Sequence, residues 1–257
     1  MRHLRISFVG QCHTVGYPGV PPDAAFPQVC RAALQSRRPG TEVELLLQEY
    51  YHPSQLVGAV AAALRACPRV VVIEVVGWLA VKGRGAVDLS RLPFGVRSAY
   101  QRVRHFRHVS AAITARLPGN PEVVHRVKDT LVNWAGVALG GIPLRHARST
   151  VTEYEDHLDR AIAQVGGAPA TGCVLQGPGA PNLALDSRRL PSDMLERYRA
   201  VEEMARRLAA RHGVLYVDRW DTVDTRFFSS GSIRPTAEGH STWGHLLADR
   251  LIEAGLV

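Results

Sequence analysis

The chain has 257 residues, of which 46% are hydrophobic, so it is long enough to build one full-sized core. Its longest apolar stretch, 70–80, is shorter than the roughly 18 residues that span a bilayer and contains Glu74, which excludes a membrane helix. The formal charge of +8 comes almost entirely from arginine, because only Lys82 and Lys128 are lysines, and no nucleic-acid motif accompanies it; we therefore expect a bacterial, GC-rich genome and no nucleic-acid partner.

Short apolar runs along the chain have the length and composition of buried parallel strands. In chain order they cover 4–9, 43–47, 70–76, 172–176 and 214–217. Helical patterns alternate with these runs: a stripe over 56–64 that stops before Pro68, a helix opened by the capping box Thr152-x-x-Glu155 and ending near Gly166, a stripe over 194–208 closed by Gly213, and a last stripe over 243–251. This alternation predicts an α/β fold, a three-layer α/β/α sandwich around a mainly parallel five-stranded sheet, flavodoxin-like in its layering.

One long segment does not fit a minimal sheet of this kind. Residues 94–148 separate the third and fourth predicted strands by far more than one crossover helix, and they are rich in arginine and histidine. We interpret them as a basic helical insertion or lid within a single domain that covers 1–257. Since ligands of parallel sheets bind beyond the carboxyl ends of the strands, we look for chemistry in the residues that directly follow each strand.

The cysteines give no sign of a metal site or of disulfides. They are dispersed, with no C-x-x-C pair, at Cys12, Cys30, Cys67 and Cys173. The sequence also has no P-loop, no G-x-G-x-x-G fingerprint and no His/Asp/Glu cluster with metal spacing, so we predict no cofactor and no metal. Residues 1–10 predict a strand and not a signal peptide, and we expect a cytoplasmic protein without a membrane anchor.

Two sequence blocks carry a resemblance to a known family. The first expected strand runs into Gly10-Gln11-Cys12-His13, and Pro235-Thr-Ala-Glu-Gly-His240 enters the last helical stripe. This order of pieces resembles the SGNH (GDSL-type) hydrolases over nearly the whole chain outside the insertion. The resemblance implies the SGNH fold and places the nucleophile of the family at Cys12.

The remaining positions of the family pattern carry other residues. The resemblance sets Arg234 where the family has its catalytic His, Gly231 where the orienting Asp stands, and Trp78 in place of the oxyanion-hole Asn. Arginine cannot act as a general base near neutral pH because its pKa exceeds about 12. The usual esterase chemistry of the family is therefore not expected here, and either another reaction uses the same crevice or the domain binds without catalysing.

Cys12 is the strongest candidate for a catalytic residue. A thiol becomes a nucleophile with less help than a hydroxyl needs, and its expected place at the start of a helix favours the thiolate. Arg234 is the candidate clamp for an anionic group or a developing oxyanion. The alternatives are a small buried cysteine that fills a gap and a surface arginine.

Three histidines are candidates for a base. His52 follows Tyr51 in the second crevice loop and is the best placed; His13 directly follows Cys12, so their side chains should diverge, and His240 is expected to be a structural residue at a helix end. We assign Cys12, His52 and Arg234 to catalysis. Candidate substrate-binding residues are Gln11, His13, Tyr51, Trp78, Asn182 and His240. Glu74 lies within a strand and is expected to be a paired structural carboxylate.

The leading hypothesis is an enzyme of SGNH-like fold that transfers acyl groups or exchanges thioesters, with Cys12 as nucleophile and a small, anionic or carrier-bound substrate. The basic insertion would suit an acidic acyl carrier protein or the phosphates of a coenzyme A thioester. Two alternatives stay open: a non-catalytic binding or scaffold domain, and a catalyst without a covalent intermediate that uses Arg234 and a histidine.

Overall fold

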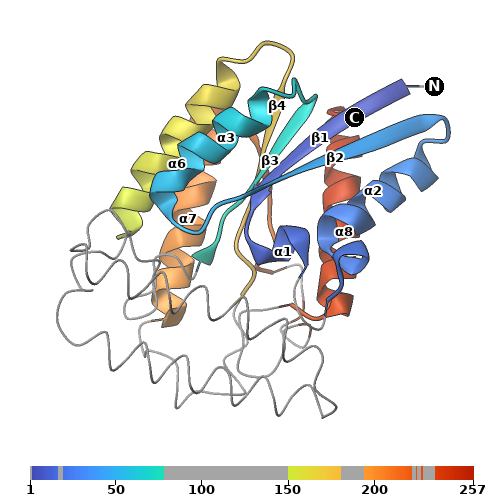
Figure 1. Cartoon of the computed structure of the whole chain (residues 1–257). Coiled ribbons are helices and arrows are strands. Elements are labelled where there is room, and N and C mark those ends of the chain that lie inside the picture. The colour runs from blue at the N-terminus through green and yellow to red at the C-terminus, as the bar shows by residue number, and fades with distance from the viewer. Residues whose placement is uncertain are drawn as a thin grey trace, which may run out of the picture. The chain divides into compact units, whose positions relative to one another are not determined.

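Five parallel strands form the centre of the structure. The computed structural model describes residues 2–16, 20–77, 150–180, 194–221, 224, 227 and 235–257. The strands are β1 (Arg2–Gly10), β2 (Thr41–Glu49), β3 (Val70–Glu74), β4 (Gly172–Gln176) and β5 (Leu215–Val217), paired in the order β2-β1-β3-β4-β5 (Figure 1). All five predicted strands are confirmed, with ends that differ by at most two residues from those expected.

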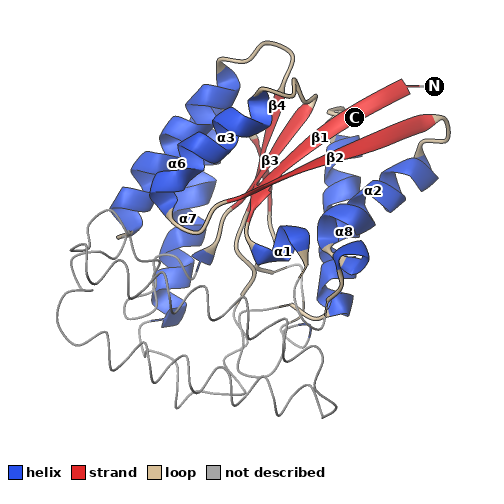
Figure 2. Ribbon diagram, viewed as in Figure 1, coloured by secondary structure: helices blue, strands red, loops and turns tan. Residues whose placement is uncertain are grey.

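Helices cover both faces of this sheet (Figure 2). On one face lie α3 (Leu56–Leu64), α6 (Val151–Gly166) and α7 (Met194–His212), and on the other lie α2 (Phe26–Arg37) and α8 (Ala237–Glu253). Three short helices lie between these elements. The helix α1 (Cys12–Val15) follows β1, η1 (Pro22–Ala24) precedes α2, and η2 (Pro53–Gln55) precedes α3. The predicted three-layer sandwich is therefore confirmed for the described residues.

The central strand β3 shows how the sequence builds these layers. All of its residues are buried, and its β-branched side chains alternate between the two cores. Val71 and Ile73 pack with the helices α3, α6 and α7, whereas Val70 and Val72 face α2 and α8. Glu74 ends the strand on the second of these faces, where an isolated carboxylate would be costly, so the fold must supply partners for it.

Two local expectations need correction. The helix α6 begins two residues earlier than expected, because Thr150 and Glu153 form the capping box: the Glu153 N–H donates to the Thr150 hydroxyl at 3.1 Å, and the Thr150 N–H donates to Glu153 at 2.9 Å. The sequence contains two overlapping Thr-x-x-Glu matches, and the first of them caps the helix. The helix α2 has no counterpart among the predicted elements, because its N-cap residue Ala25 provides no side-chain cap and the segment before it is rich in proline.

The basic insertion expected at 94–148 lies outside the described residues. Within the described part of the chain, no helix is long and apolar enough to cross a membrane.

Candidate active site

The turn from β1 into α1 lies at the carboxyl edge of the sheet and places Cys12 as the first residue of α1. Gly10 is needed at this turn, because a Cβ there would come within 2.6 Å of Glu74 Oε2 and 2.4 Å of Thr14 Cγ2. The turn is closed by Thr14, whose N–H donates to the Gln11 carbonyl at 2.8 Å and whose hydroxyl donates to the same oxygen at 2.5 Å. The position expected for Cys12, directly after the first strand at a helix start, is thus confirmed.

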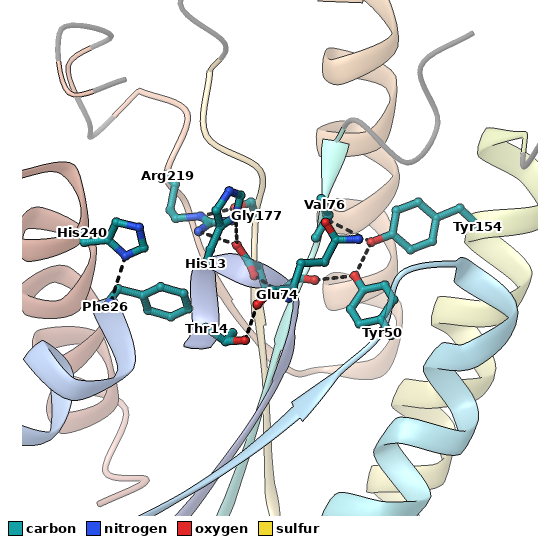
Figure 3. A network of polar contacts seen from close by, with 11 residues as sticks. His13, Thr14, Phe26, Tyr50, Glu74, Val76, Tyr154, Gly177, Arg219 and His240 are labelled. Carbon is teal, nitrogen blue, oxygen red and sulfur yellow. Dashed lines mark hydrogen bonds and ion pairs between the residues drawn. The ribbon is translucent and has the colours of Figure 1, made fainter. Parts of the chain in front are cut away.

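The carboxylate of Glu74 is bound to the residues on both sides of Cys12, and Figure 3 shows its contact with one of them, His13. Its Oε2 accepts a hydrogen bond from the Gln11 N–H at 3.2 Å, and its Oε1 lies 2.9 Å from Nδ1 of His13. Burial alone would raise the pKa of Glu74, but His13, Arg219 and the Gln11 N–H together lower it to about 2. Glu74 is therefore ionised, and it ties the end of β3 to the turn that carries Cys12.

Arg219, which follows β5, closes this buried cluster from the other side. Its Nη1 donates to Glu74 Oε1 at 3.3 Å, its Nε donates to the Gly177 carbonyl, and its guanidinium lies 3.9 Å from the centre of the Trp243 ring. Glu74 is 1% exposed and Arg219 2% exposed, so water cannot screen either charge. The two charges need each other, since removal of either one leaves the other buried without a counter-ion.

The tautomer of His13 follows from its partner. An ionised carboxylate can only accept hydrogen bonds, so Nδ1 of His13 carries the proton that it shares with Glu74. In the neutral ring, the lone pair is then on Nε2. His13 is 5% exposed and its ring packs edge-on against Trp243, with the ring centres 6.0 Å apart. The structure thus presents a carboxylate-oriented imidazole at the edge where parallel sheets bind ligands.

Two buried tyrosines fix the end of β3 from the opposite face. The Tyr50 hydroxyl donates to the Glu74 carbonyl at 2.6 Å, which uses its one proton, so the Tyr154 hydroxyl donates to Tyr50 over the 2.7 Å between them. The Tyr154 oxygen in turn accepts from the Val76 N–H at 2.9 Å. Because these bonds hold backbone atoms on both sides of Val75, they set the direction in which the Glu74 side chain leaves the strand.

His240, a candidate substrate-binding residue in the sequence, joins two helices in the structure. Its Nδ1 accepts the N–H of Phe26 at 3.0 Å, which joins the start of α2 to α8, and the residue is fully buried. Burial, and to a smaller degree the neighbouring His13, lowers the pKa of His240 to about 3. In the folded chain the His240 ring is therefore neutral, with its proton on Nε2.

Folding stability is expected to fall as the pH drops below 6.5, because His240 binds a proton in the unfolded chain but not in the folded one. Between its ordinary pKa of 6.5 and its folded pKa of about 3, the unfolded state holds more protons, so the free energy of unfolding decreases as the pH falls. Glutamine at this position can accept the Phe26 N–H without titrating. Melting temperatures measured from pH 7.5 to 5 should therefore depend less on pH in His240→Gln, and equal slopes in both proteins would contradict this.

The described residues at the sheet edge line a small, partly open cavity. Its volume is about 20 Å³, room for one water molecule, and its walls include His13, Glu74, Gly77, Gly179, Arg219 and Trp243. These residues follow or end β1, β3, β4 and β5 or lie on α8. The carboxyl edge of the sheet is thus the place where the described polar groups converge.

The other predicted site residues are distributed as follows. His52 is buried and caps η2: its Nδ1 accepts the Ser54 N–H at 3.1 Å and lies 2.7 Å from the Ser54 hydroxyl. The Tyr51 N–H donates to the Gln55 side chain at 2.9 Å. The structure does not describe the Cys12 side chain, and Trp78, Asn182 and Arg234 lie outside the described residues, so their assigned roles stay predictions.

Sequence reasoning recognised Glu74 as a paired carboxylate but missed its partners. Arg219, Tyr50, Tyr154 and Trp243 were not singled out as site residues. A usable signal was present for Arg219, because it follows β5 by two residues on the strand-end loops where the site was sought. Among the described residues, no group of three or more His, Cys, Asp or Glu side chains is placed to hold a metal ion.

The fold resembles those of several solved lipases and esterases. The lipase/acylhydrolase of Enterococcus faecalis aligns over 99% of this chain and 97% of its own, with 14% identity and a TM-score of 0.58. An acetylxylan esterase of Geobacillus stearothermophilus, solved as a catalytic variant with a serine replaced by alanine, aligns over 96% of this chain and 94% of its own, with 13% identity and a TM-score of 0.58.

A protein of Desulfitobacterium hafniense assigned to the G-D-S-L family of lipolytic proteins gives a similar result. It aligns over 96% of this chain and 99% of its own, with 14% identity and a TM-score of 0.54. No protein-family model and no curated protein matches the sequence. The chain therefore has the hydrolase-like fold of the GDSL-type (SGNH) lipases and esterases, as its sequence blocks predicted.

Proposed function

We propose that this protein is an acyl-processing enzyme in which Cys12 attacks an ester or thioester and carries the acyl group before hydrolysis or transfer. The observation that carries the proposal is the position of Cys12 at the β1–α1 turn, with both of its neighbours in the chain held by the buried Glu74 carboxylate. A fixed turn at the carboxyl edge of the sheet is the arrangement that a nucleophile needs, because misplacement by about 1 Å costs orders of magnitude in rate.

The proposed reaction has two balanced steps. The Cys12 thiolate forms a C–S bond to the acyl carbon, and the bond to the leaving alcohol or thiol breaks, with a proton going to the leaving group. An incoming water, alcohol or thiol then forms a new bond to the acyl carbon and gives up its proton, and the C–S bond breaks to return the thiolate. A thiolate is a good leaving group, so this chemistry suits a cysteine.

The solved structures support the hydrolase-like part of this proposal. The proteins of E. faecalis and G. stearothermophilus are named as a lipase/acylhydrolase and an acetylxylan esterase, and a serine is catalytic in the latter. In this chain the sequence pattern puts Cys12 at the nucleophile position. A small anionic or carrier-bound substrate, with Arg234 as anion clamp and an acyl carrier protein or coenzyme A thioester as acyl donor, completes the proposal.

A second candidate is a domain that binds without catalysing. The observation that favours it is the close packing of the buried cluster: Glu74, His13 and Arg219 satisfy one another, and the cavity beside them holds about one water molecule. A crevice that had lost its activity would be filled in this way.

Thiol labelling and acylation, followed by intact-protein and peptide mass spectrometry, separate the two candidates. Burial raises the pKa values of Cys30 and Cys173 to about 12, so these thiols should react slowly in the folded protein, and exposed Cys67 is the matched comparator. We expect p-nitrophenyl acetate and S-acetyl-N-acetylcysteamine to acylate Cys12 at least tenfold faster than Cys67. Cys67→Ala should leave turnover unchanged, and Cys12→Ala should abolish it.

The contrary result is equally clear. If Cys12 is acylated no faster than Cys67 and turnover of both esters survives in Cys12→Ala, the covalent mechanism is wrong. If the folded protein turns over neither ester and Cys12 is never acylated, the binding domain becomes the better description.

A further inference from the structure

We propose that Arg219 is a catalytic residue of this site, where its guanidinium donates a hydrogen bond to the acyl oxygen as negative charge develops on that atom. The inference rests on the proposed acyl chemistry and names the group that stabilises the charge formed when Cys12 attacks. The arginine that the sequence favoured for such a contact, Arg234, lies outside the described residues.

The guanidinium of Arg219 has one nitrogen that the surrounding fold does not use. Its Nε donates to the Gly177 carbonyl, and its Nη1 donates to Glu74 Oε1 at 3.3 Å. Its Nη2 has no hydrogen-bond partner in the part of the chain that the structure describes. A guanidinium only donates, so the N–H groups of Nη2 require an acceptor such as an oxygen atom.

The side chain that carries this unused nitrogen lines the cavity at the sheet edge. The cavity walls also include Glu74 and Trp243, and both of these residues contact the guanidinium. The cavity therefore adjoins the guanidinium end of Arg219, which extends toward Glu74 and His13 (Figure 3). Its volume of about 20 Å³ has room for one water-sized group. A single acceptor oxygen of a substrate fits this space and supplies the partner that Nη2 requires.

The guanidinium and the turn that carries Cys12 are held by the same carboxylate oxygen. Glu74 Oε1 lies 2.9 Å from Nδ1 of His13 and 3.3 Å from Nη1 of Arg219. His13 is the residue directly after Cys12, which begins α1 at the carboxyl edge of the sheet. An acyl group on Cys12 would therefore form at the edge of the sheet where Arg219 lies.

Three contacts fix the guanidinium before any substrate binds: the Gly177 carbonyl, the Glu74 carboxylate and the Trp243 ring. Arg219 is 2% exposed, so bulk water screens its charge little. A fixed donor in such a place stabilises a developing charge without having to reorganise. Stability alone does not require the buried pair of Arg219 and Glu74, because apolar side chains of similar volume often stabilise a core equally well.

In the acylation step, the Cys12 thiolate forms a C–S bond to the acyl carbon, and the π electron pair of the carbonyl moves onto the acyl oxygen. Arg219 donates an Nη2–H hydrogen bond to this oxygen and keeps its proton, since arginine is a negligible acid near neutral pH. The electron pair then returns to the carbonyl as the bond to the leaving group breaks. The leaving alcohol or thiol departs with the electrons of that bond and takes up a proton.

Arg219→Lys tests this role in the full chain, because lysine keeps a positive charge beside Glu74 but lacks the planar fork that presents Nη2. Rapid-quench mass spectrometry compares two reactions of Cys12: acylation by p-nitrophenyl acetate, which puts charge on the acyl oxygen, and alkylation by iodoacetamide, which does not. We expect acylation to slow by about 10²–10³-fold, while alkylation stays within about threefold of the wild type. A side chain that merely shapes the turn would change both rates together.

Chemical rescue provides a second measurement. In Arg219→Ala, guanidinium ion added to the solution should restore part of the acylation rate. Methylammonium, which has the charge but not the planar fork, should restore less. Circular dichroism shows whether this variant folds, and if it does not, the two rates of Arg219→Lys decide the question alone.

The matched control is Arg207→Lys, which alters an exposed arginine that lies 3.4 Å from the carboxylate of Glu155. It should react as the wild type does with both reagents. The assignment of Arg219 is overturned if Arg219→Lys is acylated within about threefold of the wild-type rate, or if its acylation and alkylation slow equally. Acylation of Cys12 in the wild type would then still support the proposed function. If the wild type forms no acyl-Cys12, the proposed function and this inference both fall.

Discussion

Replacing Glu74 with leucine is expected to lower the free energy of unfolding by about 3–5 kcal/mol, the usual cost of leaving a buried charge without its counter-ion. Arg219 would keep its contacts with the Gly177 carbonyl and the Trp243 ring but would lose the carboxylate that neutralises it. The Gln11 N–H and the His13 Nδ1–H would also lose their acceptor. Denaturant unfolding followed by circular dichroism measures this loss.

The double variant Glu74→Leu/Arg219→Met is the matched control. It removes both charges and puts apolar side chains of similar volume in their place. Its loss in the free energy of unfolding should therefore be well below the sum of the losses of the two single variants. A double variant as unstable as that sum would show that the two residues do not act as a pair. This cycle concerns stability alone, and its outcome does not depend on whether the site is catalytic.

Trp243→Ala is expected to lower the free energy of unfolding by a similar amount, about 3–5 kcal/mol, because it removes a large side chain that is 1% exposed. The Trp243 ring lies against Phe26 at 6.2 Å between ring centres, His13 at 6.0 Å, His240 at 5.9 Å, and the Arg219 guanidinium at 3.9 Å. Its loss would open a cavity between α2 and α8 and remove a cation–π contact from a desolvated arginine.

The control for this substitution is Trp220→Ala, which truncates the same side chain at a position that is only partly buried. It should lower the free energy of unfolding clearly less than Trp243→Ala in the same chemical unfolding experiment, because the Trp220 side chain is only partly buried. Equal losses in the free energy of unfolding at the two positions would mean that the packing around Trp243 stabilises the fold no more than that around a partly buried tryptophan. Because Trp243 also lines the cavity at the sheet edge, Trp243→Leu gives a milder test that keeps most of the buried apolar area.

The layers of this fold could be predicted because they depend on local patterns. The run 70–73 is apolar throughout, which marks a strand buried on both faces, and each of the predicted runs became a strand. The helix α2 could not be predicted because it does not depend on a local pattern. Its first residues lack a capping side chain, and its packing against α8, 200 residues later in the chain, is not visible in its own sequence.

The sequence indicated the edge of the sheet where polar residues gather, but not which residues gather there. The rule that ligands bind beyond the strand ends pointed to the edge of the sheet where the described polar groups converge, and the GDSL-like turn correctly put Cys12 at the start of α1. The sequence favoured His52 for its place in a strand-end loop and disfavoured His13 because it adjoins Cys12, and neither ground says anything about hydrogen bonds. Ser54 and Phe26 decide the tautomers of His52 and His240, and neither contact could be read from a motif.

The sequence by itself determined the alternating strands and helices, the position of Cys12, and the fact that Glu74 in an apolar strand must find a partner. Only the tertiary structure decided which partners it finds: His13, 61 residues away, and Arg219, 145 residues away. The physical reason is that these contacts depend on strand order and on which face each side chain leaves. Both are fixed by the packing of the whole sheet, and it is that packing which turns a buried carboxylate into the group that orients an imidazole.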